Sequence, residues 1–509
     1  MQLDNLFFLT TEFNLYSLLM WISLIAMMLG IFRRKSFAIL WAIIVASVAF
    51  YKIKYDLSCS MSIFGMDLML ISCLAYFGHK IKKLAPQIAY TCFASLCFIF
   101  IHPTLTKSLI TYHNHSVTNI QLDSNGELLV KFQNQADLKL WMIENASQYD
   151  IIYPAFTPID KSYSLDEYLI VNIQDNQNAD ALTDQIEGHN LVTYVEGNEL
   201  LELKLPNHSP STLNDSSLSL NDPHTNKQWM AKEFDLDKFH KNLQKAGTQK
   251  KTTTTIAILD TGIDSRHEDL IDNYTSTSQA YDSDDRGHGT HCAGIAAAVS
   301  GNKIGIASWI PQGLPIKVTS IKVMGRLGVG SQRTIINGIL KAADSGYDVI
   351  SMSLGGKSNP TRERAYREAV KYANEKGAIV VVAAGNSSMD ARGYSPANTE
   401  GVIVVSALDS DMQLAEFSNT VDGLPYGIAA PGKDIYSTLP NSLYGPQSGT
   451  SMAAPFVSGI IGLMKYYNPQ LTTKETYNIL KKSAFKKNGQ VIINPISALS
   501  ATMSLEASE

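Results

Sequence analysis

Four apolar runs follow one another in the first hundred residues, and they restrict this part of the chain more than any other feature. They cover residues 15–32, 37–51, 63–77 and 88–101. A helix that spans a bilayer needs about 17–25 residues, so the first run is long enough alone and the others reach that length with their flanks. A buried soluble helical domain is the alternative, but soluble helices would show polar faces, which these runs hardly do. We therefore predict an all-α four-helix membrane domain over residues 1–105.

The short loops between these runs predict the orientation of this domain. Basic clusters at residues 33–35 and 80–83 follow the first and third runs, and basic loops stay on the cytoplasmic side. With four helices, everything after residue 105 then lies outside, although Lys52 and Lys54 run against this assignment. The beginning of the chain lacks the basic region and small-residue cleavage site of a simple signal peptide. We expect a multi-pass membrane protein with its larger part on the extracytoplasmic side.

Charge and cysteine usage exclude two further classes. The formal net charge is −5, and no basic stripe of the kind that binds nucleic acid appears, so we predict no nucleic-acid partner. Four of the five cysteines (Cys59, Cys73, Cys92 and Cys97) lie in or beside the apolar runs, and Cys292 is alone in the rest. A disulfide framework cannot be built there from one cysteine, so stability must come from a large core, with or without metal ions.

The middle of the chain has the pattern of a small α+β unit. Alternating segments at 127–132, 151–156, 168–173 and 192–204 read as strands, and 136–145 and 180–188 read as helices. The order β-α-β-β-α-β is typical of a ferredoxin-like arrangement, which we place at residues 118–205. Residues 206–220, rich in Ser, Asn, Asp and Pro, then form a predicted linker.

The block from residue 221 to 500 alternates apolar strands with helical patterns, which predicts an α/β fold with a parallel sheet. Its strand 255–260 ends in a carboxylate, Asp260, followed by Thr261 and Gly262, and ligands meet such sheets at the carboxyl ends of their strands. Taken alone, this motif is as consistent with a structural aspartate as with a functional one.

Two further segments carry candidate chemistry. His288 stands between two glycines just before a small-residue helix, and its imidazole can act as a base if Asp260 holds its other nitrogen. A metal site made of His288, His291 and Cys292 is the competing interpretation, but it lacks a fourth ligand nearby in sequence. Ser451 begins a helix inside Gly-Thr-Ser-Met-Ala-Ala-Pro, where it could be only an N-cap or could gain from the positive helix terminus.

Together these three segments resemble the subtilisin family of serine proteases. The resemblance rests on the order Asp260, His288, Ser451 within Asp-Thr-Gly, His-Gly-Thr-His and Gly-Thr-Ser-Met-Ala-Ala-Pro, and it covers about residues 221–498. It implies that Ser451 attacks the scissile carbonyl, that His288 transfers the proton and that Asp260 orients His288. It also implies that Asn386, after the strand-like Val381–Ala383, donates to the oxyanion.

The resemblance extends to substrate and metal sites. The substrate-binding residues that it implies are Ser353, Leu354, Gly355, Gly328 and Ala384, which are small or apolar and so predict broad, apolar-leaning specificity for polypeptides. Asp269 and Asn302 resemble side-chain ligands of the family's calcium loop, although the loop around Asn302 is one residue longer than usual. Cys292 is found in one branch of the family and is expected to be a buried neighbour of the site rather than a nucleophile.

The unit at 118–205 resembles the family's inhibitory propeptide by its pattern and position. The sequence therefore predicts a membrane-tethered, extracytoplasmic serine endopeptidase, inhibited by its own propeptide-like unit and released by self-cleavage in the linker. The alternative is a catalytically silent relative that binds or senses ligands through the membrane domain.

Overall fold

The computed structural model describes residues 126–174, 178–203, 205–206, 220–246, 253–358, 363–487 and 489–506. The chain divides into two compact units, residues 1–121 and 122–509, and all the described residues belong to the second. The predicted membrane domain and most of the predicted linker lie outside the described residues. Among the helices that are described, none combines the length and apolarity needed to cross a bilayer.

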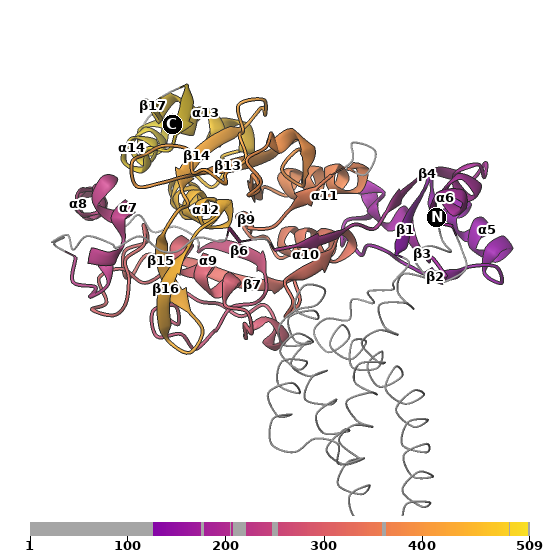
Figure 1. The fold of residues 1–509 in the computed structure, drawn as a ribbon, viewed down its shortest axis with the longest axis horizontal. Helices are drawn as coiled ribbons and strands as arrows, with labels where there is room; N and C mark the ends of the chain where they lie inside the picture. The colour runs from indigo at the N-terminus through magenta and orange to yellow at the C-terminus, as the bar shows by residue number, and fades with distance from the viewer. Residues whose placement is uncertain are drawn as a thin grey trace, which may run out of the picture. The chain divides into compact units, whose positions relative to one another are not determined.

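A sheet of eight strands organises the second unit, and its order is β17-β18-β14-β13-β11-β9-β6-β7 (Figure 1). From β18 to β7 all neighbours are parallel, and only the edge strand β17 is antiparallel. The strands are β17 (Phe485–Lys487), β18 (Gln490–Ile492), β14 (Gly427–Pro431), β13 (Val402–Leu408), β11 (Ile379–Ala383), β9 (Val349–Met352), β6 (Thr254–Asp260) and β7 (Ile316–Lys322). The predicted α/β fold with a parallel sheet is thus confirmed.

The two faces of this sheet bury two separate cores, because successive side chains of a strand point to opposite faces. Ile256 and Ile258 of β6 join one core, and Ala257 and Leu259 join the other. The first core is covered by α9 (His288–Ala297), α12 (Thr450–Tyr467) and α14 (Pro495–Glu506). The second is covered by α10 (Gln332–Asp344) and α11 (Arg364–Glu375) (Figure 1). A strand buried on both faces is apolar throughout, which explains why β6 reads as a continuous apolar run.

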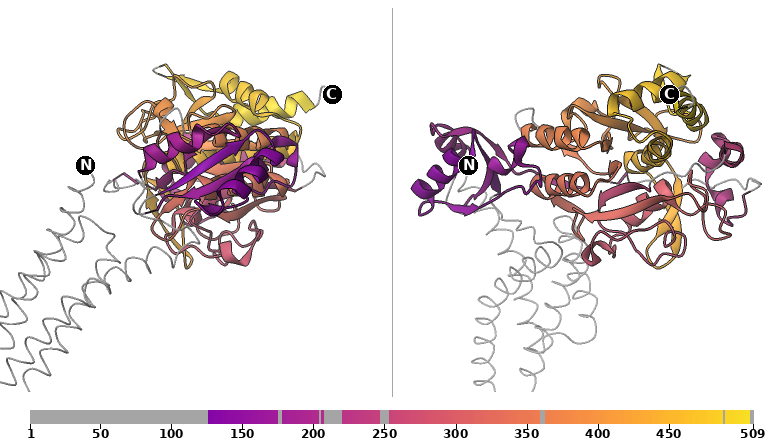
Figure 2. Two further views of the ribbon diagram at one scale, coloured as in Figure 1. Left: turned by 90° about the vertical axis from the view of Figure 1, so that its right-hand side faces the viewer. Right: turned by 180° about the vertical axis from the view of Figure 1, so that it is seen from behind.

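Residues before the linker form a second, antiparallel sheet in the order β2-β3-β1-β4. Its elements are β1 (Glu127–Phe132), α5 (Gln135–Asn145), β2 (Asp150–Ile152), β3 (Tyr168–Asn172), α6 (Ala179–Glu187) and β4 (Val192–Gly197). Helices α5 and α6 lie on one face of this sheet (Figure 2). There Leu138 and Leu182 belong to one buried cluster with Leu128 and Val130 of β1. On the other face, Leu129 shares a core cluster with residues of α10 and α11. This sheet therefore has no face left without a partner.

Two predicted strands differ in their bounds. The expected strand 151–156 ends at Ile152, because Pro154 has no N–H to continue a ladder. The expected strand 192–204 is divided at Asn198 and Glu199 into β4 and β5 (Leu200–Glu202), and β5 leaves the four-stranded sheet. It pairs instead, antiparallel, with β8 (Val329–Ser331), which follows β7.

Candidate active site

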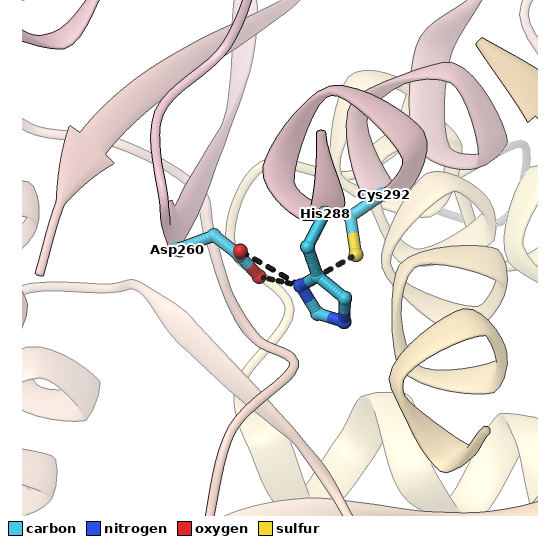
Figure 3. A group of neighbouring side chains, drawn as sticks. All are labelled: Asp260, His288 and Cys292. Carbon is cyan, nitrogen blue, oxygen red and sulfur yellow. Dashed lines mark hydrogen bonds and ion pairs between the residues drawn. The ribbon is translucent and has the colours of Figure 1, made fainter. Parts of the chain in front are cut away.

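Asp260 and His288 meet at the carboxyl end of the parallel sheet. Asp260 is the last residue of β6 and His288 the first of α9, and both are buried (Figure 3). The Nδ1 atom of His288 donates to both carboxylate oxygens of Asp260, at 2.8 and 2.9 Å. Burial by itself lowers the pKa of His288, but Asp260 opposes this, and the net pKa lies well above its usual value. The Nε2 atom of His288 is buried without a hydrogen-bond partner among the described residues, so it can bind a reacting group.

Glycines make this close approach of α9 to β6 possible. A Cβ on Gly289 would lie 2.1 Å from the carbonyl oxygen of Gly262, so no other residue fits there without movement. Gly262 turns the chain after β6 with φ +115°, a conformation that other residues rarely adopt. The two glycines of the motifs therefore set the distance between Asp260 and His288.

A residue that the sequence analysis missed, Asp284, fixes the start of α9. Its buried carboxylate accepts hydrogen bonds from the N–H groups of Gly287 and Thr290, both at 2.8 Å, and from the Thr290 hydroxyl at 2.8 Å. It also accepts from the hydroxyl of Thr261 at 2.8 Å, and the N–H of Thr261 donates to Asp260. Asp284 thus connects both residues of the pair, although its position in an acidic run made it look like a solvated loop residue.

Ser451 lies in the first turn of α12, on the same side of the sheet. Its hydroxyl donates to the carbonyl of Ser353 at 3.2 Å, and the hydroxyl of Ser353 donates to the carbonyl of Ser451 at 2.7 Å. The Cys292 thiol connects the serine to the histidine, because its Sγ lies 3.4 Å from the Ser451 carbonyl oxygen and 4.0 Å from Nδ1 of His288. The three predicted segments therefore meet, with the serine hydroxyl turned toward Ser353.

Asn386 stands beside the serine after strand β11. Its side-chain oxygen accepts from the N–H of Thr450 at 2.8 Å and from the Thr450 hydroxyl at 2.9 Å. Because the oxygen is held in this way, the amide nitrogen is directed away from Thr450, and it lies 3.3 Å from where a Cβ on Gly449 would be. A second residue not predicted from sequence, Asn419, supports the loop by donating to the carbonyl of Ala384 at 2.8 Å.

Neither Cys292 nor His291 has the environment of a nucleophile or a general base. Burial raises the pKa of the Cys292 thiol, which keeps it protonated. Burial lowers the pKa of His291 to about 3, and its Nε2 donates to the carbonyl of Gly445 at 3.1 Å. Asp260, His288 and Cys292 have possible metal-ligand atoms within 4.8 Å of one another, but His291 does not belong to this group. The metal set considered in the sequence analysis is therefore not assembled.

A cavity of about 390 Å³ opens next to Ser451, between the loops after β9 and β11. Among the predicted substrate-binding residues, Ser353, Leu354 and Gly355 line it, whereas Gly328 and Ala384 do not. The neighbours of Ala384 line it instead, because the Ala384 side chain is buried in the core behind β11. Tyr394, which the sequence analysis did not select, also contributes to the wall.

The segment that follows the four-stranded sheet runs along this cavity. Strand β5 pairs with β8, and the N–H of Leu203 donates to the carbonyl of Gly328 at 2.7 Å. Leu200, Glu202 and Leu203 line the same cavity as Ser451. One methyl carbon of Leu205 lies 3.6 Å from where a Cβ on Gly449 would be. Residues 200–203 of the chain itself therefore follow a path along this cavity toward the serine, and Leu205 lies close to Gly449 beside it.

Two side chains at the end of β4, Glu196 within the strand and Asn198 just after it, cap helices of the larger sheet. The Glu196 carboxylate, 2% exposed, accepts from the N–H groups of Arg364 at 3.3 Å and Ala365 at 3.2 Å, at the start of α11. Helix α11 has no side-chain cap of its own at Glu363. The side-chain oxygen of Asn198 accepts from the N–H of Arg333 at 2.8 Å, in the first turn of α10. The smaller sheet thus supplies caps that both helices use.

The predicted calcium residues lie together about a loop that follows α9. Asp269 is fully buried and accepts from the N–H of Ile306 at 2.8 Å and from the side-chain nitrogen of Asn302 at 2.9 Å. Asp222, not selected from sequence, accepts from the N–H of Gly301 at 2.8 Å. Burial raises the pKa of Asp269 to about 7 and also raises that of Asp222, and neither pairs with a Lys or Arg in the described part of the chain. Two buried carboxylates without a basic partner fit a hard cation, but Asn302 presents its nitrogen to Asp269, so its oxygen could coordinate only after the amide turns.

Comparison with known proteins gives a family match over the larger sheet. Residues 251–497 match the model of the subtilase family. Thermitase from Thermoactinomyces vulgaris is 42% identical over 214 residues, which are 41% of this chain and 74% of that protein. Subtilisin DY from Bacillus licheniformis is 38% identical over 242 residues, which are 46% of this chain and 85% of that protein.

A solved structure shows a likeness of fold over a longer stretch. The epidermin leader peptide processing serine protease from Staphylococcus aureus matches with a TM-score of 0.56 at 22% identity. The match covers 74% of this chain and 98% of that one, so it reaches beyond the family match. At this identity it supports the fold alone.

Proposed function

This chain belongs to the subtilase family and is a subtilisin-type serine endopeptidase, and we propose that Asp260, His288 and Ser451 are its catalytic triad. The observation that carries the proposal is the buried imidazole of His288, which is held through Nδ1 by both oxygens of Asp260 while its Nε2 has no hydrogen-bond partner among the described residues. Only in this tautomer can Nε2 accept the proton of a nucleophile.

The reaction follows from these positions. The Ser451 hydroxyl leaves the carbonyl of Ser353 and turns to Nε2 of His288, which takes its proton as the oxygen attacks the scissile carbonyl. His288 then gives that proton to the leaving amine, and water repeats the sequence to release the acyl group. The Asp260 carboxylate stabilises the imidazolium that forms in both halves, which agrees with the direction in which it moves the pKa of His288.

Asn386 is the proposed donor to the oxyanion. Thr450 holds its side-chain oxygen, so the amide nitrogen is fixed before the substrate arrives and no reorganisation is needed as charge develops. The N–H of Ser451, in the first turn of α12, would be the second donor. Nothing in the described residues favours the catalytically silent alternative.

Labelling with a fluorophosphonate tests the triad. The reagent should label the wild-type chain covalently and should not label Ser451→Ala, since the label forms on the attacking oxygen. Absence of labelling in the wild type, after removal of residues up to the linker and with calcium present, would contradict the proposal. Labelling that persists in the variant would place the nucleophile elsewhere.

We further propose that substrates bind as an added strand beside β8, along the path that residues 200–203 take now. Backbone pairing of this kind holds an extended peptide without regard to its side chains. The small and apolar residues of the cavity wall, Ser353, Leu354 and Gly355, then favour broad, apolar-leaning specificity. Tyr394 limits the size of the side chain that the cavity accepts.

The four-stranded unit is proposed to be a ferredoxin-like propeptide that inhibits the enzyme. Its tail lies where a substrate would lie, and its Glu196 and Asn198 cap α11 and α10. Because these caps belong to the smaller sheet, the absence of that sheet would also slow the folding of the two helices.

Residues 126–206, added as a separate chain, should inhibit the mature enzyme, and the Glu196→Ala form of this separate chain should inhibit it more weakly. Equal inhibition by the wild-type and Glu196→Ala forms would argue against the capping role.

Calcium is proposed as a structural ion near the loop after α9. Asp269 and Asp222 would hold it by their carboxylates, and Asn302 would add its side-chain oxygen after the amide turns. When bound, the ion would neutralise two buried carboxylates that otherwise have no basic partner. Isothermal titration of the chelated protein with calcium would measure this site, and wild-type affinity in Asp269→Asn would exclude it.

The position of the enzyme is proposed from sequence. The apolar runs and basic loops before residue 105 favour a multi-pass anchor with the peptidase domain on the extracytoplasmic side, and cleavage in residues 206–220 would release it. The size of the fluorophosphonate-labelled band in membrane and soluble fractions tests this model. Mature enzyme that still carries the first 105 residues covalently would contradict release.

A further inference from the structure

Asn419 lies in the connection between β13 and β14, at the edge of the sheet where β11 ends. Strand β13 is the parallel neighbour of β11, so this connection and the loop after β11 leave the sheet next to each other. The Asn419 side chain is fully buried, although it belongs to no helix or strand. A buried amide needs hydrogen bonds to both its nitrogen and its oxygen, and the loop after β11 supplies the partners.

The side-chain amide of Asn419 holds that loop on both sides of Asn386. Its nitrogen donates to the carbonyl of Ala384 at 2.8 Å, and its oxygen accepts from the N–H groups of Ser387 and Met389, both at 3.0 Å. Ala384 stands two residues before Asn386, and Ser387 follows it directly. One side chain therefore fixes the backbone before and after the proposed oxyanion donor.

Gly385 leaves the room that this arrangement needs. It has φ +102°, and a Cβ at this position would lie 2.5 Å from the Asn419 side-chain nitrogen, so a larger residue would displace the amide. Its carbonyl accepts the N–H of Asn419 at 2.9 Å, and its own N–H donates to the Thr450 hydroxyl at 3.0 Å. Thr450 in turn holds the side-chain oxygen of Asn386. Asn419 thus fixes the backbone around Asn386, and Thr450 fixes its side chain.

We infer that Asn419 is a positioning residue for the proposed oxyanion site, which holds the backbone of Asn386 so that its amide nitrogen meets the developing negative charge. The inference rests on the proposed function, because it requires that Asn386 donates to the oxyanion. Such a donor is effective because it is in place before the charge develops, so a relaxed loop would lose this advantage even with Asn386 unchanged. Asn419 does not line the substrate cavity, so it acts through the loop alone.

Asn419→Asp tests this inference with the least change of shape. In its ionised form the new side chain keeps the oxygen that accepts from Ser387 and Met389, but it turns a second oxygen toward the carbonyl of Ala384. Repulsion between these two oxygens displaces the loop, and a displacement of about 1 Å should lower kcat by about 10²-fold. Titration with the fluorophosphonate, carried to completion, gives the concentration of active sites, so a smaller folded fraction is not counted as slower catalysis.

A double-mutant cycle with Asn386→Ala separates positioning from a purely structural role. If Asn419 acts through Asn386, Asn419→Asp should lower kcat by only about threefold or less once Asn386 is replaced, because the donor is already lost. An effect of the same size in both backgrounds would overturn the inference, as would an unchanged kcat in the single variant. If Asn419→Asp gives no active sites to titrate, Asn419→Ser takes its place in the same cycle, since its smaller hydroxyl adds no charge.

Ser418→Ala is the matched control. Ser418 is the buried neighbour of Asn419, and its hydroxyl accepts from the N–H of Ala407 and donates to the carbonyl of Asn419, neither of which belongs to the loop of Asn386. This variant also loses buried hydrogen bonds, yet its kcat per active site should be unchanged. An equal loss of kcat in the control would make the effect one of general destabilisation and overturn the inference. Failure of the proposed function is distinguishable, because the wild type itself would then take up no fluorophosphonate.

Discussion

Replacing Asp284 by asparagine should weaken both the fold and catalysis, although Asp284 touches no substrate. Its carboxylate accepts on one oxygen from Thr261, Arg286 and Gly287, and on the other from the N–H and hydroxyl of Thr290. An asparagine can keep only one of these oxygens. If it keeps the first, its NH2 group faces the N–H of Thr290, which is then buried without an acceptor.

The magnitude follows from these contacts. A buried donor that loses its acceptor costs about 1–3 kcal/mol. Loss of a negative charge at a helix N-terminus adds about 0.3–1 kcal/mol. Together these predict that Asp284→Asn lowers the free energy of unfolding by about 1–4 kcal/mol. Because His288 is the first residue of α9, a displacement of this helix start by about 1 Å would lower kcat by about 10²-fold.

Denaturant unfolding should be measured in the Ser451→Ala background, which prevents self-digestion, and kcat should be measured in the active enzyme. Asp285→Asn is the matched control, because the neighbouring Asp285 is exposed and no comparable set of hydrogen bonds from the described residues reaches it. The control should change the free energy of unfolding by less than about 0.5 kcal/mol. If Asp284→Asn behaves like the control in both measurements, the positioning role assigned to Asp284 is wrong.

Three further outcomes are expected. Asn386→Ala should lower kcat by about 10²–10³-fold with little change in KM, a magnitude taken from subtilisin; an unchanged kcat in steady-state assays would remove Asn386 from the oxyanion site. In a pH series, kcat/KM of the wild type should rise as His288 loses its proton, because only the neutral imidazole accepts a proton from Ser451. Asp260→Asn removes the charge that raises the pKa of His288, so in this variant kcat/KM should be much lower and should rise at a lower pH. A rise at the wild-type pH would refute the assignment. Chelation of calcium should lower the melting temperature of the wild type, and this difference should vanish in Asp269→Asn; a difference of the same size in both would place the ion elsewhere.

The sequence predicted the fold of the larger sheet well because its signals are local. Continuous apolar strands such as β6 alternate with helical patterns, and this alternation specifies a parallel sheet. The motifs around Asp260, His288 and Ser451 each stand at the end of a strand or the start of a helix, so the parallel arrangement itself brings them to one edge. For these residues, element type and position in the chain were sufficient.

Residues defined by contacts distant in sequence could not be predicted in the same way. Asp284 stands in the run Asp282-Ser283-Asp284-Asp285, where composition alone indicates a solvated loop, and only its bonds to Thr261 and Thr290 distinguish it. Asp222 stands just after the predicted linker, in a stretch rich in Asn, Asp and Pro, but its carboxylate accepts the N–H of Gly301, 79 positions later. In both cases the relevant information is tertiary, and no local pattern carries it.

The passage of β4 into β5 shows a further limit of sequence patterns. Residues 192–204 have one continuous strand-like pattern, and Gly197 marks a break without indicating which sheet the second half joins. The partner, β8, is more than 120 residues away. Strand propensity predicts that a segment is extended, but the choice of partner depends on the assembled surface.

The pairing of β5 with β8 also has a consequence for how activity would depend on protein concentration. In the proposed inhibition, residues 200–203 compete with substrate while they remain joined to Ser451 through one chain, at an effective concentration in the millimolar range or above that does not change on dilution. A single cut in the linker would convert this into an association of two separate molecules. Dilution would then favour the active form, so an enzyme cleaved at a crowded surface would remain inhibited until its two parts separated.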